Sequence, residues 1–284
     1  MKTIKYFFEA IFIYLSFIIA KLIGLSASRN LFAFIFKKIG PLFRSEKIVN
    51  YNLERFSKNI SSESKNKILS NMWSNYGMTF VEYIFLDKFR KQNQHIKIEG
   101  EEVLNSILRD NKPVIFVSGH FANFELISME ITKRKVKLAT LYRPLNNYFL
   151  NPLMEYLRKK YVCNNQFKKG IGGVKDSMEY LKKGYSIGLM IDQRVSEGEK
   201  IKFFDQTALT TTLPAQLALK YKISIIPVFI ERNKNNIFVI KFFDPILASS
   251  FKNKFQISEK LNKILEGMIS KNPNQWIWTH NRWK

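Results

Sequence analysis

One histidine and one glutamate follow a short apolar run in a pattern that could carry acid–base chemistry. The run covers residues 114–117 and closes at Ser118-Gly119, and His120 comes next, five residues before Glu125. Short β-branched runs that end at glycine predict a buried strand, and the apolar residues behind Glu125 predict a helix. The sequence therefore places an imidazole and a carboxylate where a strand passes into a helix, a frequent place for catalytic groups in open α/β sheets.

A histidine beside a carboxylate has the chemistry of a general base, because the carboxylate fixes the tautomer of the imidazole. The chain has no GxSxG segment around Ser118, so no nucleophile is evident. The simplest reaction is direct transfer, in which the base deprotonates a substrate hydroxyl that attacks a bound acyl donor. The alternative is a structural pair, a buried histidine hydrogen-bonded to a glutamate at a helix start. With three histidines and 23 acidic residues, chance supplies one HxxxxE pair roughly a quarter of the time.

The turn between strand and helix decides whether these two side chains can meet. On one continuous helix, five residues rotate Glu125 about 140° away from His120. We therefore expect His120 in the turn, followed by a helix that begins near Asn123, a suitable N-cap residue. The free N–H groups of this helix start would then lie near His120, suited to an anion or a developing oxyanion.

Strands and helices alternate from residue 96 to residue 270, which predicts an α/β fold with a mainly parallel sheet flanked by helices. No linker separates a second domain, so we assign residues 46–284 to one catalytic domain and residues 1–45 to an N-terminal membrane-anchoring segment. Predicted strands cover 96–100, 114–117, 137–142, 186–191, 223–230 and 237–243. Predicted helices cover 101–109, 146–161, 174–183, 258–269 and a segment from the threonines at 210–212 to residue 219.

The N-terminal segment is apolar over the length that a bilayer crossing needs. Only Glu9 and Lys21 interrupt residues 7–27, and about 20 such residues span a membrane. Two lysines precede the segment as in a signal peptide, but Lys21 divides it and a second apolar helix follows at 31–39. We expect a retained helix, single-pass or interfacial. The basic residues that follow it favour a cytoplasmic location of the remaining chain; they are Lys37, Lys38 and Arg44.

The composition is strongly basic. Lys and Arg number 46 against 23 Asp and Glu, and the formal charge of +23 favours contact with nucleic acid, an anionic membrane, phosphorylated lipid or an acidic carrier protein. The basic residues are spread along the whole chain without a recognition-helix pattern, which argues against a nucleic-acid binder. A non-catalytic scaffold at a membrane surface is a third class of function.

The remaining candidate side chains suggest structural roles. Cys163 is the single cysteine, which excludes an internal disulfide, and we expect it to be structural. His95 lies in a polar stretch and is expected at the surface, whereas His280 is expected to pack within the aromatic C-terminal tail. Three scattered histidines and one cysteine have no metal-ligand spacing, so we expect no metal.

The segment 119–125, Gly-His-Phe-Ala-Asn-Phe-Glu, resembles the HX4(D/E) signature of lysophospholipid-type acyltransferases, in the GHxxNxE form of the bacterial late lipid A acyltransferases. The similarity extends over nearly the whole chain. It includes the apolar N-terminus, Tyr142-Arg143-Pro144, Asp192-Gln193, Phe203-Phe204, Thr210-Thr211, Ile226-Pro227-Val228 and the closing segment from Pro273 to Trp283. That closing segment separates this family from the glycerolipid acyltransferases.

The resemblance implies a glycerol-3-phosphate acyltransferase-like fold and transfer of a fatty acyl chain from acyl carrier protein to a hydroxyl of a hydroxyacyl chain on a Kdo-bearing lipid A precursor. His120 would be the base and Glu125 its partner, with no acyl-enzyme and no cofactor. The enzyme would lie at the bacterial inner membrane, an anionic surface, with its catalytic domain on the cytoplasmic face. Another glycolipid or phospholipid acceptor is the alternative.

Members of this family also use an arginine for oxyanion or phosphate contacts and an aspartate at a later strand end, which Asp192 matches. Residues 167–175 carry lysines where relatives carry arginine, and a lysine keeps the charge but loses the bidentate fork. Arg143, which follows a predicted strand, is either an ion-pair residue or a phosphate contact. The expected substrate-binding residues are Asn123, Arg143, Lys169, Lys175, Asp192 and Gln193.

Overall fold

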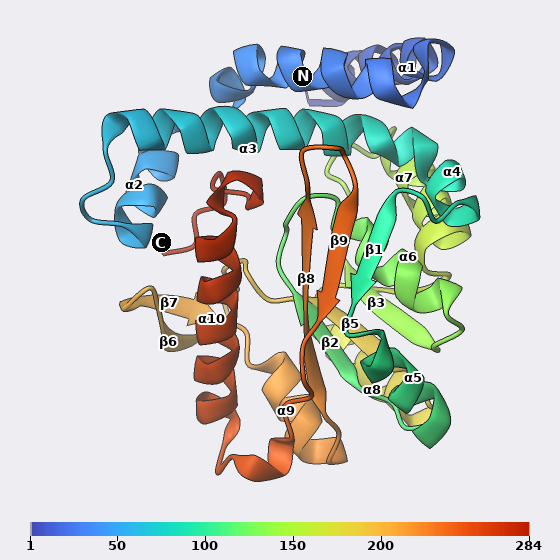
Figure 1. Ribbon diagram of the computed structural model, residues 1–284, viewed down its shortest axis with the longest axis vertical. Helices are drawn as coiled ribbons and strands as arrows, with labels where there is room; N and C mark the ends of the chain where they lie inside the picture. Colours follow the sequence, from blue (N-terminus) through green and yellow to red (C-terminus); the bar gives the residue numbers. More distant parts are fainter. Residues whose placement is uncertain (1, 284) are drawn as a thin grey trace.

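The computed structural model describes residues 2–283 and has a seven-stranded sheet at its centre (Figure 1). The strand order is β1-β9-β8-β2-β5-β3-β4, and every neighbouring pair is parallel except the antiparallel pair β8–β9. The predicted mainly parallel sheet is confirmed. Its strands are β1 (Ile96–Glu99), β2 (Ile115–Ser118), β3 (Leu138–Tyr142), β4 (Asn165–Lys168), β5 (Ser186–Met190), β8 (Ile225–Arg232) and β9 (Phe238–Phe242).

Strand β2 lies in the middle of the sheet, between β8 and β5, and all four of its residues are buried. After β2 the chain crosses to β3, on the far side of β5, and after β5 it crosses back to β8, on the far side of β2. The connections that follow these two neighbouring strands therefore run in opposite directions. Their carboxyl ends form a topological switch point, the place where open α/β sheets bind ligands.

Helices cover both faces of the sheet, as predicted. Figure 1 shows α9 (Leu213–Tyr221) and α10 (Lys254–Lys271) on one side and α6 (Glu125–Lys133) on the other. Further helices between the strands are α5 (Glu101–Asp110), α7 (Asn151–Leu157) with the π-helical turn η3 (Arg158–Val162), and α8 (Ile171–Lys182).

Several local expectations are corrected. The sequence pattern missed strand β4 and the hairpin of β6 (Glu199–Phe203) and β7 (Gln206–Thr210). Thr210 pairs with Glu199 in this hairpin, so α9 begins only at Leu213. His95 is not a solvated surface residue, because its ring packs on Phe89 at 4.7 Å and burial lowers its pKa to about 4.

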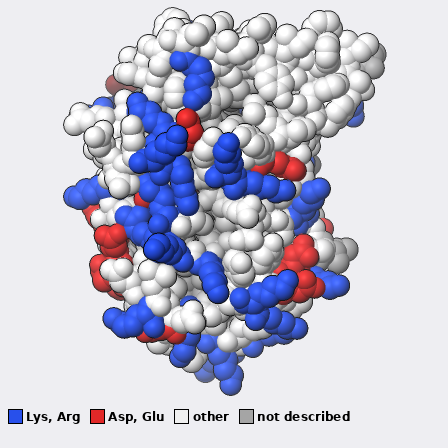
Figure 2. All heavy atoms as spheres, turned by 90° about the vertical axis from the view of Figure 1, so that its right-hand side faces the viewer, with Lys and Arg blue, Asp and Glu red and all other residues white. Residues whose placement is uncertain are grey.

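The N-terminal helix α1 (Lys2–Ile39) is bent at Gly24, whose φ of 80° lies in the left-handed region. Within the described chain it is the one helix long and apolar enough to cross a membrane, with a mean hydropathy of 2.1 over its most apolar window. Large side chains such as Phe12 and Leu22 are 71% and 81% exposed. In Figure 2 the upper part of the molecule, where α1 lies, shows few charges, whereas lysines and arginines dominate the surface below it.

The other side of α1 packs on α3 (Ser62–Glu82), as Figure 1 shows. Phe17 and Phe32 contact Phe80 with ring-centroid distances of 5.1 Å and 5.8 Å. These contacts make α1 a packed element of the fold, although its other side exposes large apolar side chains. Helix α2 (Glu46–Phe56) lies between α1 and α3 in the chain.

A buried ion cluster joins α1, α3 and β8. Glu82 is fully buried and accepts a hydrogen bond from Arg29 Nε at 2.6 Å and from Arg232 Nη2 at 3.0 Å. The amide of Asn123, in the loop after β2, donates to the same carboxylate at 2.9 Å. Because buried charges are costly without partners, this carboxylate makes the positions of three elements interdependent.

The Glu82→Gln variant should be strongly destabilised, because it leaves two buried guanidinium groups without a counter-charge. We expect a loss of about 3–5 kcal/mol of unfolding free energy. Denaturant titration in detergent, followed by tryptophan fluorescence, measures this loss.

The matched control is Glu54→Gln, because Glu54 pairs with Lys65 at 3.3 Å while its side chain is 56% exposed. Exposed pairs contribute about 0–1 kcal/mol, so this variant should unfold almost like the wild type. Equal stability of the two variants would show that the buried cluster does not hold these elements together.

Candidate active site

The loop between β2 and α6 positions His120 at the carboxyl edge of the sheet. Gly119 is required here, because a Cβ at this position would lie only 2.8 Å from the ring of Phe121. The N–H of Ala122 donates to the carbonyl of Gln275 at 3.1 Å, so the C-terminal tail holds the loop from the outside. These contacts limit the conformations open to His120.

The hydrogen-bond partner of His120 is Asp192, which follows β5. Asp192 Oδ1 lies 2.8 Å from His120 Nδ1, and Oδ2 accepts the backbone N–H of His120 and the Nε1–H of Trp276, both at 2.9 Å. An ionised carboxylate only accepts hydrogen bonds, so Nδ1 carries the hydrogen. Nε2 is therefore the nitrogen that can take a proton from a substrate.

The pair also changes both pKa values. Burial alone would lower the pKa of His120, but the charge of Asp192 and the hydrogen bond to it raise the pKa, with a further contribution from Glu125. Burial alone would raise the pKa of Asp192, but the charge of His120 and the hydrogen bonds from His120 and Trp276 lower it to about 2. Asp192 thus stays ionised while His120 titrates.

Glu125 begins α6, as expected, but its carboxylate contacts groups other than His120. Oε1 accepts the Tyr83 hydroxyl and the Arg158 Nε–H, both at 2.7 Å. The direct hydrogen bond expected from Glu125 to His120 is absent among the described contacts, and Asp192 fixes the tautomer instead. The sequence suggested Glu125, five residues away, as the partner of His120. In the fold, the parallel sheet instead places the carboxylate of Asp192, 72 residues away, beside the imidazole. Glu125 still lines the same cavity as His120.

Arg158 is the site residue that the sequence analysis missed. It lies at the π-helical turn after α7, and its Nη2 donates to the Tyr83 hydroxyl at 3.1 Å. Burial alone would lower its pKa, but Glu125 and Tyr83 raise it, so the guanidinium stays charged. One signal was present: Arg158 follows Leu150 and Met154 at four-residue spacing, which places a charge on the apolar face of the predicted helix.

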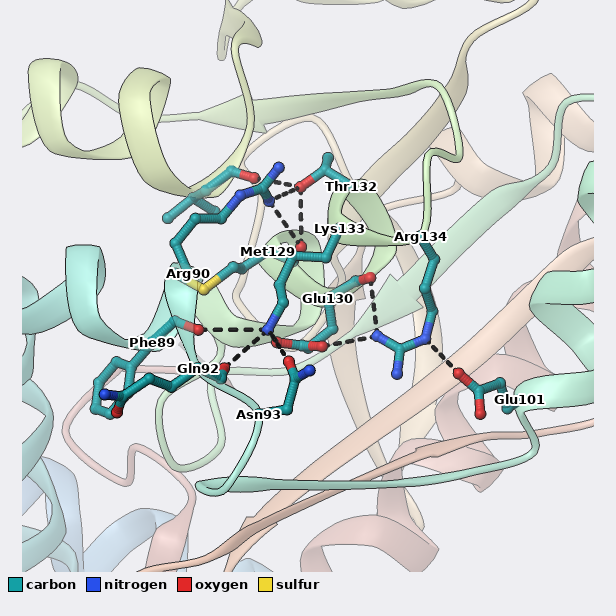
Figure 3. Close-up of polar contacts among 11 residues, drawn as sticks. Phe89, Arg90, Gln92, Asn93, Glu101, Met129, Glu130, Thr132, Lys133 and Arg134 are labelled. Carbon is teal, nitrogen blue, oxygen red and sulfur yellow. Dashed lines mark hydrogen bonds and ion pairs between the residues drawn. The ribbon is translucent and has the colours of Figure 1, made fainter.

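A polar cluster holds the far end of α6 (Figure 3). Glu130 is fully buried and accepts hydrogen bonds from Lys133 at 2.9 Å and Arg134 at 2.7 Å. Lys133 also donates to Asn93 at 2.6 Å, and Arg134 donates to Glu101 at 2.6 Å. The cluster fixes α6 against the segment after α4 (Leu86–Lys91) and the start of α5, and thereby fixes the helix that carries Glu125.

His120, Glu125 and Arg158 line a cavity of about 330 Å³, which we call the first cavity. Three of the predicted substrate-binding residues, Arg143, Lys169 and Gln193, also line it. The rest of its wall includes buried apolar side chains: Phe116, Ile127, Ile131, Leu138, Leu189 and Val228. Such a site combines a polar end, able to bind charged groups, with an interior suited to an apolar chain.

The other predicted substrate-binding residues lie elsewhere. Asn123 is fully buried and donates to Glu82, and it does not cap α6, whose N-cap is Phe124. Asp192 is 2% exposed and orients His120. Lys175 is exposed on α8 and does not line the first cavity. The tertiary contacts, rather than the residue types, decide these positions.

Metal-dependent and nucleophilic chemistry find little support in the described residues. Over residues 2–283, no group of three or more His, Cys, Asp or Glu side chains is placed to hold a metal ion. Cys163 is buried, and burial raises its pKa to about 11, so it stays a thiol. Ser118 lines the first cavity, and its hydroxyl donates to the carbonyl of Gly119 at 3.4 Å.

Comparison with known proteins identifies the family. The model of the family "bacterial lipid A biosynthesis acyltransferase" matches residues 1–284, the whole chain. The chain belongs to this family. It is therefore an acyltransferase of lipid A biosynthesis, which confirms the resemblance and excludes a non-catalytic scaffold or a nucleic-acid binder as its class.

Individual relatives in this family are distant. The lipid A biosynthesis palmitoleoyltransferase of Escherichia coli (strain K12) is 26% identical over 251 residues, 86% of this chain and 80% of that protein. The lauroyltransferase of the same organism is 22% identical over 250 residues, 85% of this chain and 79% of that protein. A solved 1-acyl-sn-glycerophosphate acyltransferase from Thermotoga maritima aligns with 89% of this chain and 100% of its own, at a TM-score of 0.43 and 13% identity.

The Asp192→Asn variant should change the pH dependence of the lipid A acyltransferase. A base must be unprotonated, so with His120 as the base the rate should rise with pH through the pKa of His120, which Asp192 raises. Without that charge, burial lowers the pKa, and the acid limb of the kcat profile moves to lower pH. The rate should fall about 100- to 10,000-fold, because the tautomer is no longer fixed. Asp244→Asn, at an exposed position, is the control. An unshifted acid limb would contradict this role.

The Arg158→Lys variant tests the buried guanidinium. Lysine keeps the charge but cannot bond Glu125 and Tyr83 together through a planar fork. We expect kcat to fall about 10- to 100-fold. Arg109→Lys, whose side chain is 75% exposed in the wild type, should retain full activity. A wild-type kcat for Arg158→Lys would show that the fork has no role in the site.

Proposed function

We propose that this enzyme transfers a fatty acyl chain from acyl carrier protein to a hydroxyl of a hydroxyacyl chain on a Kdo-bearing lipid A precursor. The observation that carries the proposal is a histidine, oriented by a buried aspartate, at the polar end of an apolar cavity. General-base catalysis of direct acyl transfer needs that arrangement. It needs no acyl-enzyme and no cofactor beyond the acyl-carrier co-substrate.

The chemistry begins when His120 Nε2 takes the proton of the acceptor hydroxyl. The hydroxyl oxygen attacks the thioester carbonyl, and a tetrahedral oxyanion forms. As this intermediate collapses, the new ester C–O bond remains, the C–S bond breaks, and the thiolate takes the proton from the imidazolium. Asp192 stabilises the transient positive charge on His120 through the 2.8 Å hydrogen bond.

Arg158 and Glu125 act together beside the base. The permanent charge of Arg158 suits it to stabilise the oxyanion or to bind a substrate phosphate. Glu125 holds the guanidinium through the 2.7 Å contact and adds negative charge near the imidazolium. In this mechanism Glu125 is a positioning residue as much as a partner of His120, and Arg143, Lys169 and Gln193 contact substrate at the polar end of the first cavity.

The charge distribution supports an acidic carrier as the donor. The chain carries a formal charge of +23, and Arg143 and Lys169 lie where the first cavity is polar. Positive charge on the surface below α1 (Figure 2) raises the rate at which an acidic protein finds its site. The acyl chain would enter the apolar part of the first cavity while the carrier remains outside.

The exposed apolar side of α1 supports an enzyme held at the bacterial inner membrane. Its last turn carries Lys37 and Lys38, and Arg44 follows. Basic residues at this place favour the cytoplasmic side and contact with anionic lipid. The acceptor lipid then reaches the site laterally, while the carrier protein arrives from the cytoplasm.

The direct experiment incubates purified membranes with acyl carrier protein loaded with a mixture of chains and a Kdo-lipid A precursor, and identifies the product by mass spectrometry. Wild-type enzyme should add a single acyl ester to a hydroxyacyl chain. The His120→Ala variant should lose at least about 100-fold in rate while remaining in the membrane fraction.

The control for this experiment is His95→Ala, which removes an imidazole outside the site and should leave the rate within about twofold. Transfer at the wild-type rate by His120→Ala would show that another group is the base. Efficient transfer to a phospholipid, with none to the Kdo-bearing precursor, would overturn the acceptor assignment.

A further inference from the structure

A second cavity, of about 460 Å³, is also lined by His120. The two cavities share four lining residues: His120, Phe124, Arg158 and Gln193. From there the second cavity extends between α1, α3, α7 and the C-terminal tail. A base shared by two cavities is the arrangement that a reaction between two chain-bearing substrates requires.

The lining of the second cavity suits an apolar chain with an anionic end. Most of the lining side chains are aliphatic or aromatic, among them Phe80, Leu150 and Met154. The charged side chains are cationic, Arg44 and Arg158, and none of the lining residues is acidic. Apolar walls with a few cations favour lipids that carry phosphate or carboxylate groups.

Helix α1 forms one wall of this cavity. Ile13 and Phe17 line it, whereas Phe12 and Leu15 on the other side of the helix are 71% and 54% exposed. The same helix thus separates the cavity from an exposed apolar surface. The first cavity has no wall from α1, and its polar end carries Arg143 and Lys169.

Hydrogen bonds hold α1 in this position. The Tyr14 hydroxyl donates to the carbonyl of Phe149 at 2.9 Å, and the Asn147 amide donates to the carbonyl of Tyr6 at 2.9 Å. Both bonds connect α1 to the segment before α7, which supplies the opposite wall. The wall is therefore part of the folded protein, and the cavity depends on α1.

From these observations we infer that the second cavity binds the hydroxyacyl chain of the acceptor lipid, that α1 forms its wall through Ile13 and Phe17, and that Arg44 contacts the anionic headgroup. The inference rests on the proposed function. The donor chain occupies the first cavity, so the acceptor hydroxyl and the thioester carbonyl meet at His120 Nε2. The N-terminal helix is then a substrate-binding element in addition to a membrane anchor.

The test compares two tryptophan substitutions on the same helix. Ile13→Trp fills part of the cavity and should raise the KM for the acceptor about 10-fold, the equivalent of excluding two methylene groups. The KM for acyl carrier protein should stay within twofold of the wild-type value. Leu15→Trp, on the exposed side, should change neither KM.

A second pair of variants tests the contact of Arg44 with the anionic headgroup. Arg44→Gln should also raise the KM for the acceptor, whereas Lys47→Gln, exposed in the same region, should not.

A photolabel gives a second readout that does not depend on turnover. A diazirine in the hydroxyacyl chain of the acceptor should label the peptide that contains Leu150 and Met154, and a diazirine in the donor chain should label Ile127 and Ile131. Two results would overturn the cavity assignment while leaving the proposed function intact. One is wild-type transfer with equal kinetics for Ile13→Trp and Leu15→Trp, and the other is labelling of Leu150 by the donor chain. Absence of transfer by the wild type would instead overturn the proposed function.

Discussion

The hydrogen bond between His120 and Asp192 connects the carboxyl ends of two neighbouring strands, and the rest of the site is arranged around it. Both residues follow parallel strands whose onward connections diverge, and the loop after β2 and the C-terminal tail contact each other at the point where they meet. The tail contributes Trp276, whose indole N–H binds the same carboxylate. Burial strengthens each of these contacts, and it makes the pair costly to rearrange.

A second constraint connects the apolar N-terminal helix α1 to this site. Glu82 pairs with Arg29 from α1 and Arg232 from β8, and it also accepts a hydrogen bond from Asn123 in the loop that carries His120. A shift of α1 would leave a buried charge unpaired, so the helix and the loop keep a fixed relation. This rigidity explains how a helix that carries exposed apolar side chains can also form the wall of a cavity that ends at His120.

The contacts of Glu125 change how the HxxxxE pattern is understood in this chain. The carboxylate begins α6, whose far end is fixed by the Glu130 cluster, and it presents Arg158 to the first cavity. The motif therefore contributes two different functions from one short segment. In the proposed mechanism its histidine is the base, while its glutamate orients a cation that the sequence places 33 residues later.

The sequence by itself determined the alternating strands and helices, the strand that ends at Gly119, and the apolar N-terminus, because these follow from local periodicity and turn chemistry. It also singled out His120, Glu125 and Asp192. Only the tertiary structure decided which carboxylate bonds the imidazole, that Arg158 joins the site, and that Asn123 faces a buried ion cluster. Such pairings depend on strand order and helix packing, which bring together residues far apart in the chain, and no local pattern encodes those distances.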